Sequence, residues 1–372
     1  MSRFFSAAFL LAVAVARLGA HHSMAAEYDD KKPVTLKGIV TKFDWGNPHV
    51  FVFLDVTSST GEIHNWACEM LSRIELKRIG WTRDSINPGD EVTIEGSAAR
   101  DGSKAMGGKL VILASGKKLA SVPPPPPARA KSSPPAPKWP DGHVRLGPAP
   151  GETGYWANPS VGGLFDATAG NIRMNADGLL QNIADASKVA PFLPWAKGLY
   201  VYRQKNLLKD DPMASCLPPG GPRQFQAANG FQIVEQPERK RIFVMSGGGN
   251  RNWRLIDMDG RALPEGDDVS PTYYGHSVGH WEGDTLVIDA TAFNERFWFT
   301  NGGLPHTESL KLREKISRPD MNTLKYEVTV TDPGAYTRPW TGSWTLQWIA
   351  GQEIEEYFCD DYNRDSERAD SH

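Results

Sequence analysis

Apolar and polar residues alternate along two long parts of the chain, and this alternation predicts that both parts are built from strands. In the first part, the runs VTLKGIVTKFDW and VFVFLDVTSSTG are separated by a break at residues 46–49. A third run (63–70) precedes a helical spacing of apolar residues over 71–79, and two more alternating runs follow. Three strands, a helix and two strands in this order are typical of a five-stranded OB-like barrel.

The second part opens with a helical pattern and continues as strands. Apolar spacing predicts a helical lead-in around residues 184–208, which Pro191 and Pro194 interrupt. From Phe225 onward, alternating runs are joined by short turns, such as the one at residues 282–284, and they predict about nine consecutive strands. A meander of this length usually closes into a barrel or a sandwich, because closure removes exposed strand edges.

A proline-rich stretch divides the two parts. The many prolines of the sequence VPPPPPARAKSSPPAPKWP lack the backbone N–H that a helix or a strand ladder needs, so the stretch predicts an extended spacer. We therefore expect a mainly β protein with an OB-like domain over 27–121, a linker over 122–141, and a larger antiparallel β-barrel or sandwich over 142–366.

The N-terminus has the pattern of a secretory signal peptide over residues 1–20. Arg3 precedes an apolar run that ends at Ala16, and small residues lead to a cleavage site after Ala20, with a second site open after Ala25. The apolar run is shorter than the roughly 20 residues of a membrane-spanning helix. We expect no transmembrane segment, and a periplasmic or extracellular location.

The charged residues argue against one class of partner. The formal net charge is −3, and the basic residues form no stripe. A nucleic-acid-binding protein needs clustered Lys and Arg to displace counterions from phosphates, so no nucleic-acid partner is expected. Arg313, Arg318 and Arg338 alternate with acidic residues, and we expect all three on solvated strand faces.

The three cysteines have no CxxC spacing, which excludes a thiolate metal cluster. In an oxidising compartment two of them can pair. We predict a disulfide between Cys216 and Cys359, since both lie in the second half, and a reduced Cys68 buried in its strand.

Two sets of motifs resemble known sequences. The segment AHHSMAAEYDDKKPVTLKGIVTKFDWGNPHVFVFLDV, with NWACEM and GWTRDSINPGDEVTIEG, resembles a family of small secreted bacterial proteins of unknown function over residues 20–120. The second part, with LLKDDPMASCLPPGGPR and YYGHSVGHWEGDTLVIDATAFN, is similar to a widespread uncharacterised secreted bacterial domain. These resemblances imply secretion and architecture, and no activity.

Residues 275–279 read GHSVG, which matches the G-x-S-x-G string of serine hydrolases. A nucleophile elbow needs a strand before the serine and a helix after it, whereas this sequence continues as HWEGDTLVI, a hairpin pattern. We therefore interpret Ser277 as an ordinary strand residue and the match as accidental.

The stretch 274–308 combines aromatic side chains, titratable groups and turn glycines, a mixture typical of a ligand pocket. Alternation places His276 and His280 on one strand face, where they would contact a ligand or, with Glu308, act as acid and base. The same histidines would also suit a solvated barrel rim, and HxxxH spacing suits zinc on a helix and not on a strand. The predicted ligand-binding residues are Tyr274, His276, His280, Trp298, His306 and Glu308.

His21 and His22 follow the predicted cleavage site. The new α-amine and the His21 ring can chelate copper, and a third nitrogen from His22, His49 or His64 would complete the metal site. The alternative is a flexible polar terminus that binds copper adventitiously.

Together these patterns favour an exported, non-enzymatic protein that binds a small, partly apolar molecule in its second domain without a cofactor. One alternative is a hydrolase or lyase that uses His276 or His280 with Glu308. The other is a copper-binding protein that acts through His21.

Overall fold

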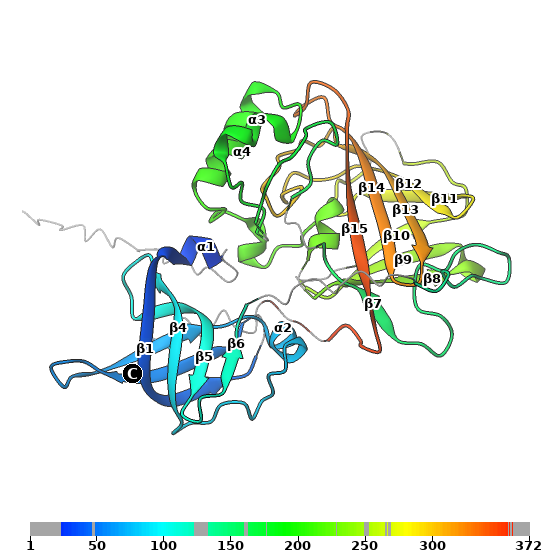
Figure 1. Cartoon of the computed structure of the whole chain (residues 1–372). Helices are drawn as coiled ribbons and strands as arrows, with labels where there is room; N and C mark the ends of the chain where they lie inside the picture. The colour runs from blue at the N-terminus through cyan, green and yellow to red at the C-terminus, as the bar shows by residue number, and fades with distance from the viewer. Residues whose placement is uncertain are drawn as a thin grey trace, which may run out of the picture.

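Two domains built from β-sheet make up the structure (Figure 1). The mainly β class predicted from the sequence is confirmed. The predicted signal peptide, His21, His22, residues 123–132 of the linker and residues 360–366 lie outside the described residues. The computed structural model describes residues 24–46, 49–122, 133–159, 163–175, 177–227, 229–248, 253–264, 266, 269–355, 357 and 359.

The first domain has the strand order of an OB-like barrel. Its elements are α1 (Met24–Glu27), β1 (Tyr28–Asp44), β2 (Phe51–Thr57), β3 (Ile63–Glu69), α2 (Arg73–Arg78), β4 (Glu91–Ala99), β5 (Ala105–Leu113) and β6 (Lys118–Ala120). The strands lie in the order β3-β2-β1-β4-β5-β6, and a parallel pairing of β3 with β5 joins them into a ring. The predicted helix between β3 and β4 begins at a capping box, in which the Ser72 hydroxyl accepts from the Glu75 amide.

The OB-like domain has its own apolar core. Val52, Leu54 and Ile94 are fully buried, and so is Cys68. Cys68 is a free thiol, as predicted, and burial raises its pKa to about 12. At neutral pH this cysteine is therefore an inert apolar side chain.

In the second domain, nine strands of the described chain close into a barrel. Its elements are β7 (Gly154–Trp156), η1 (Ile183–Asp185), α3 (Ala186–Val189), α4 (Pro194–Lys205), η2 (Pro212–Ser215), η3 (Gly221–Gln226), β8 (Phe231–Gln236), η4 (Pro237–Arg239), β9 (Arg241–Ser246), β10 (Trp253–Asp257), β11 (His276–Glu282), β12 (Thr285–Thr291), β13 (Lys311–Asp320), β14 (Thr323–Thr331) and β15 (Trp340–Ala350). The order around the barrel is β10-β11-β12-β13-β14-β15-β7-β8-β9.

Two features depart from the simple meander that the sequence predicts. β7 precedes the helices in the chain, yet it completes the wall between β15 and β8. β10 and β11 run parallel, because the connection over 258–275 carries the chain back before β11 begins. From β11 to β15 the predicted antiparallel meander is present, and Gly283 (φ 60°) supplies the left-handed residue of the β11–β12 turn.

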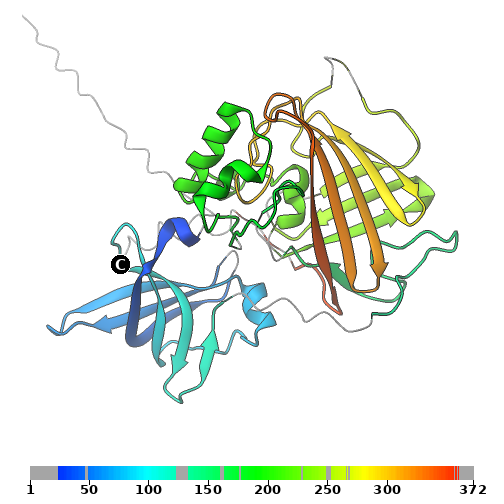
Figure 2. The ribbon, with the colours of Figure 1, turned by 45° about the horizontal axis from the view of Figure 1, so that its top comes forward.

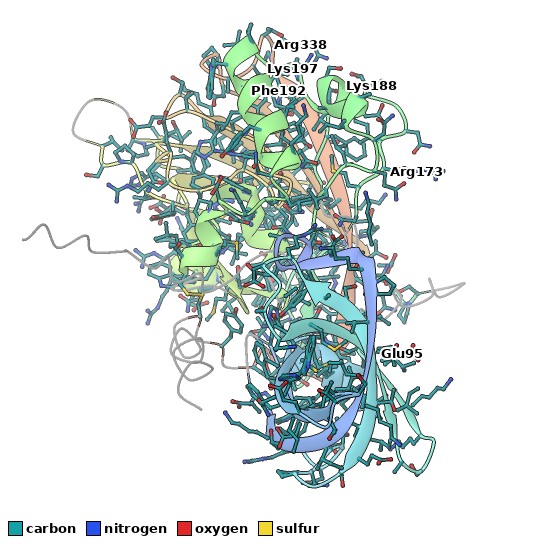
Figure 3. All side chains as sticks on the ribbon, turned by 90° about the vertical axis from the view of Figure 1, so that its left-hand side faces the viewer. Glu95, Arg173, Lys188, Phe192, Lys197 and Arg338 are labelled. Carbon is teal, nitrogen blue, oxygen red and sulfur yellow. A yellow bond between two sulfur atoms is a disulfide. The ribbon has the colours of Figure 1, made fainter. Side chains whose placement is uncertain are left out.

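α3 and α4 cover one end of the barrel (Figure 2). Pro194, which we expected to interrupt a helix, is the first residue of α4, where its missing amide costs no hydrogen bond. Phe192 stacks on Tyr200 of α4, with 5.3 Å between ring centroids. In Figure 3, Lys188 and Lys197 lie at the outer end of this helical layer, away from the OB-like domain.

Side chains fill the interior of the barrel. η3 contributes six buried residues, and its Phe225 ring lies 4.8 Å from Phe231 and 4.6 Å from Tyr326, centroid to centroid. Tyr326 in turn stacks on Trp344 at 5.6 Å. The interior is therefore a packed core, as in other small barrels.

Arg318 is not on a solvated face, contrary to our expectation. On β13 it shares the inward phase with Ile316, and its guanidinium lies beside the contacting rings of Trp156 and Trp348, 4.9 Å from each centroid. It donates to the carbonyl oxygens of Gly147 (2.7 Å) and Met321 (2.7 Å). Burial lowers the pKa of Arg318 to about 10, so the side chain stays charged. Two tryptophan faces and backbone carbonyls replace water around this cation.

The described end of the predicted linker packs on the barrel. Trp139 Nε1 donates to Glu235 (3.0 Å), and the Arg145 guanidinium lies 3.5 Å from the centroid of the Trp139 ring. Lys138 pairs with Asp284 at 3.0 Å. Residues 133–141 therefore belong structurally with the second domain.

The two domains contact each other through α2 and the chain after β15. Glu355 accepts hydrogen bonds from Arg73 (3.0 Å) and Lys77 (2.9 Å) of α2. Arg78, on the same helix, donates to the Tyr155 hydroxyl of β7. A short helix of the OB-like domain thus carries three cationic contacts to the barrel domain.

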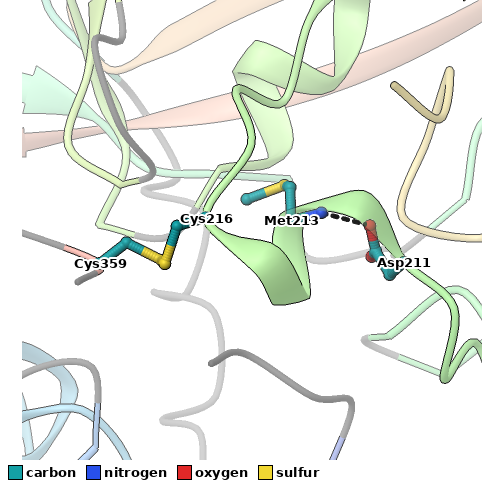
Figure 4. Close-up of a disulfide and its surroundings, with 4 residues drawn as sticks. All are labelled: Asp211, Met213, Cys216 and Cys359. Carbon is teal, nitrogen blue, oxygen red and sulfur yellow. Dashed lines mark hydrogen bonds between the residues drawn. A yellow bond between two sulfur atoms is a disulfide. The ribbon is translucent and has the colours of Figure 1, made fainter. Parts of the chain in front are cut away.

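The predicted disulfide between Cys216 and Cys359 is confirmed (Figure 4). Its Cα atoms are 5.6 Å apart, and Cys216 follows directly after η2 with φ 57°. Asp211 caps the same short helix by accepting from the Met213 amide at 3.0 Å. The bond therefore fixes the C-terminal segment to the loop that precedes β8.

Candidate functional site

A cavity lies beside the parallel pair of strands β10 and β11. In the described chain these parallel strands share one register pair, Asp257 with Val278, whereas β11 and β12 are paired from His276 to Glu282. On the N-terminal side of that pair lies a cavity of about 810 Å³, which we call the seam cavity. Its volume is within the range of small-molecule sites.

The seam cavity mixes aromatic and polar groups. β10 contributes Trp253 and Arg254, and the start of β11 contributes His276 and Ser277. The connection between these strands contributes further residues on either side of its middle, namely Arg261, Ala262, Pro264, Thr272, Tyr273, Tyr274 and Gly275. Trp253 is 56% exposed, so one face of a large apolar ring is available at the opening.

One lining residue, Arg254, belongs to a buried ion pair. Arg254 donates through Nη1 to Glu314 Oε1 (3.0 Å) and through Nε to Ser277 Oγ (3.0 Å). Tyr326 donates its hydroxyl to the same Glu314 oxygen at 2.7 Å. Burial alone would lower the pKa of Arg254, but the charge of Glu314 raises it overall. The guanidinium is therefore a permanent cation held in one orientation.

Two of the predicted ligand-binding residues form the wall. Burial raises the pKa of Tyr274, which keeps its phenol neutral at physiological pH. His276 Nε2 lies 3.3 Å from the Ser270 carbonyl oxygen, which favours the tautomer or charge state with a proton on that nitrogen. Both side chains project from the chain at the point where it enters β11.

The other four predicted residues do not line the seam cavity. His280 is exposed and lies 3.2 Å from Glu282 on its own strand, and Glu308 is also exposed. Trp298 is buried beneath the Arg203 guanidinium, 4.6 Å from its ring centroid. His306 is buried as well, with Nε2 3.1 Å from the Phe297 carbonyl oxygen. The structure thus brings together Tyr274 and His276 and separates them from the rest of the predicted set.

Burial also decides the charge of His306. It lowers the pKa of this imidazole, against smaller opposing effects of the Thr307 and Phe297 carbonyls. The ring lies 4.2 Å from the Phe297 ring, centroid to centroid. His306 is therefore a neutral core residue at physiological pH.

The GHSVG string lies inside a strand. Ser277 is the second residue of β11, and a tight turn leads from that strand into β12. The strand and helix that would expose a nucleophilic serine do not flank it. Ser277 does more than an ordinary strand residue, however, because its hydroxyl accepts the Nε hydrogen of buried Arg254.

The copper prediction is not tested, because His21 and His22 lie outside the described residues. His49 contacts the buried carboxylate of Glu69, which also accepts the Tyr28 hydroxyl. His64 lies 3.5 Å from Glu62. Within the described ranges, no group of three or more His, Cys, Asp or Glu side chains is placed to hold a metal ion.

Sequence reasoning missed the two charged residues of the buried ion pair, Arg254 and Glu314. Arg254 alternates with the apolar Ile256, and Glu314 alternates with Leu312 and Ile316, so both occupy inward positions of their strands. A charged residue in the apolar phase of a strand was therefore the available signal. The pattern does not reveal that Arg254 and Glu314 pair with each other, because the two residues are 60 positions apart.

The fold and its site define a two-domain β protein with a cavity beside the parallel β10–β11 pair of its larger barrel. Residues 8–108 match the model of a family described as a family of unknown function (DUF6152), a span that ends within β5 of the OB-like domain. Neither the curated proteins nor the solved structures include a match to the chain. Among the helices that the structure describes, none has the length and apolar character to cross a membrane.

Proposed function

We propose that this chain is an exported protein that binds a small, partly apolar molecule in the seam cavity. The observation that carries the proposal is a cavity of about 810 Å³ beside the parallel β10–β11 pair, in a barrel whose other neighbouring strands are antiparallel. Aromatic rings and fixed polar groups in the lining are the combination that orients a small ligand.

Each part of the lining has a role in this proposal. Trp253 and Tyr273 supply apolar contact area, while Tyr274 and His276 supply polar anchors at the wall. Arg254 is already neutralised by Glu314, so an anionic ligand would gain little from it. A ligand with a flat apolar body and one or two hydrogen-bonding groups fits best.

Export is part of the proposal, and three observations support it. The disulfide suits an oxidising compartment, and the N-terminal pattern is that of a signal peptide. The family match begins at residue 8, inside the predicted leader. A periplasmic or extracellular location, and the resemblance of the second part to an uncharacterised secreted domain, complete the proposal.

The geometry gives less support to the alternatives. A hydrolase or lyase using His276 or His280 with Glu308 would need them in one cavity, whereas His280 and Glu308 lie outside the seam cavity. Copper binding through His21 stays a prediction, since His21 lies outside the described residues and His49 contacts Glu69.

Titration with anilinonaphthalene sulfonate tests the proposal, because this probe is flat, aromatic and fluorescent only when shielded from water. We expect saturable binding to the full-length protein. His276→Ala and Trp253→Ala should each weaken the affinity about fivefold or more. His280→Ala is the matched control, because His280 is on the same strand but outside the cavity.

Circular dichroism must first show that each variant is folded. Equal affinities for His276→Ala and His280→Ala would contradict the proposal. So would full probe binding by the Trp253→Ala protein, since the ring at the opening would then contribute nothing.

A further inference from the structure

A second cavity, of about 500 Å³, lies between the two domains. We call it the interdomain cavity. The OB-like domain contributes the start of β1, the start of β5 and α2, and the barrel domain contributes η2, η3 and the chain around residue 301. It shares no lining residue with the seam cavity, so a molecule bound here would be independent of the proposed function.

Carboxamide side chains are the distinctive groups of this lining. Each carboxamide offers a carbonyl acceptor and two N–H donors side by side. Gln226 is buried, and its Oε1 accepts a hydrogen bond from the backbone N–H of Asn301 at 3.0 Å. Five such side chains line the cavity: Asn158, Asn175, Gln226, Asn229 and Asn301.

Asn229 is the most informative of them. Its side chain is 95% buried, and neither Oδ1 nor Nδ2 has a hydrogen-bond partner among the described residues. Its backbone has φ 69°, a left-handed conformation that asparagine tolerates better than most residues. A buried amide without partners costs free energy unless something else satisfies it. The Asn229 side-chain amide can therefore form hydrogen bonds with a molecule bound in the cavity.

Two pairs of charged groups in the lining are matched to one another, Arg223 with Asp211 and Lys109 with Asp30. Arg223 forms a two-pronged ion pair with Asp211, and its Nε donates to Asn301 Oδ1 at 2.9 Å. Across the cavity, Lys109 pairs with Asp30 at 2.7 Å. A charged guest would have to compete with these internal pairs, whereas a neutral one would not.

We propose that the interdomain cavity is a second binding site and that it takes a neutral, polyhydroxylated molecule of the saccharide class. Hydroxyl groups both donate and accept, so neighbouring hydroxyls complement the paired donor and acceptor of a carboxamide. The buried Asn229 amide contacts the guest directly, and Asn158 contacts it from the exposed rim. Because both domains line the cavity, the bound saccharide bridges them.

Calorimetry and thermal melts of the full-length protein test this inference. The neutral probes are glucose, N-acetylglucosamine, maltose and cellobiose, and glucuronate is the charged comparator. We expect at least one neutral probe to bind and to raise the melting temperature by mass action. Asn229→Gly should weaken that binding about tenfold or more, since glycine keeps the left-handed backbone and removes the side chain that carries the amide.

Gln204→Met is the matched control. Gln204 is also a buried carboxamide, but its three hydrogen bonds, to Leu180, Gly178 and Gly302, are all within the protein. It does not line the interdomain cavity. We expect this variant to melt at a lower temperature with unchanged saccharide affinity. Asn229→Gly should instead bind saccharide more weakly without a comparable fall in melting temperature, because no hydrogen bond within the described protein is lost.

Asn158→Ala provides a second arm at an exposed position, should Asn229→Gly fail to fold. It too should weaken saccharide binding. The inference is overturned if no neutral probe binds at about 10 mM, if glucuronate binds more tightly than the neutral probes, or if neither asparagine variant changes the affinity.

Discussion

Replacing Glu314 should lower the free energy of unfolding of the barrel more than a substitution at its surface does. Glu314 and Arg254 are 0% and 1% exposed, and the two side chains face each other through two hydrogen bonds. Glu314→Leu leaves the Arg254 cation buried without its counterion, and it also leaves the Tyr326 hydroxyl without its acceptor. Breaking one side of such a pair costs about 3 to 5 kcal/mol.

The double variant Arg254→Met, Glu314→Leu removes both charges together. It leaves only the Ser277 and Tyr326 hydroxyls unsatisfied, at about 1 to 3 kcal/mol each or less where they find new partners. We therefore expect the double variant to lose about 2 to 3 kcal/mol less than the sum of the two single variants.

Urea denaturation followed by tryptophan fluorescence measures this cycle, since buried tryptophans such as Trp344 and Trp348 report on the barrel. Arg313→Met is the control, because Arg313 is on the same strand but points outward to Asp289. The account of a mutually dependent buried pair would be refuted if the losses in the free energy of unfolding of the two single variants added up to that of the double variant. It would also be refuted if the Glu314→Leu protein were as stable as the control.

Two further predictions concern stability. Reduction of the Cys216–Cys359 bond should lower the free energy of unfolding by up to about 5 kcal/mol, because the bond closes a loop with a sequence separation of 143. Thermal melts with and without reductant measure this loss of stability. A variant with both Cys216 and Cys359 changed to serine should melt at the same temperature with and without reductant. If reductant did not change the melting temperature of the natural protein, the prediction would be contradicted. Burial holds the pKa of His306 below its usual 6.5, so the folded state binds this proton less readily than the unfolded chain. The neutral, buried imidazole therefore stabilises the fold above about pH 6.5, and this stabilisation is lost as the pH falls below that value. Between about pH 7.5 and pH 5.5, the melting temperature of the natural protein should fall more steeply than that of His306→Gln. Parallel curves for the two proteins would argue against this account.

Local pattern sufficed where a structural element is decided by neighbouring residues. The OB-like strand order, the turn at Gly283 and the meander from β11 to β15 follow from alternation and turn chemistry. β7 was missed because three residues are too few to show a period, and its place is set by β15 and β8 on either side. The direction of β10 relative to β11 depends on a long connection, which alternation does not describe.

The candidate site shows the same division. Alternation correctly grouped His276 with His280 on one strand face, but it could not say that Ser277 faces the barrel interior instead. Tyr274 and His276 line the same cavity because they are only two residues apart. His306 was placed with them by sequence proximity, yet its environment is set by Phe297 and by the core around it.

The disulfide also links the barrel to the contact between the two domains. β8 to β15 all lie between Cys216 and Cys359 in the sequence, so the bond joins the two ends of the segment that forms these strands. Cys359 lies four residues after Glu355, which accepts hydrogen bonds from Arg73 and Lys77 of α2. The bond therefore anchors, on the barrel, the piece of chain that the OB-like domain contacts.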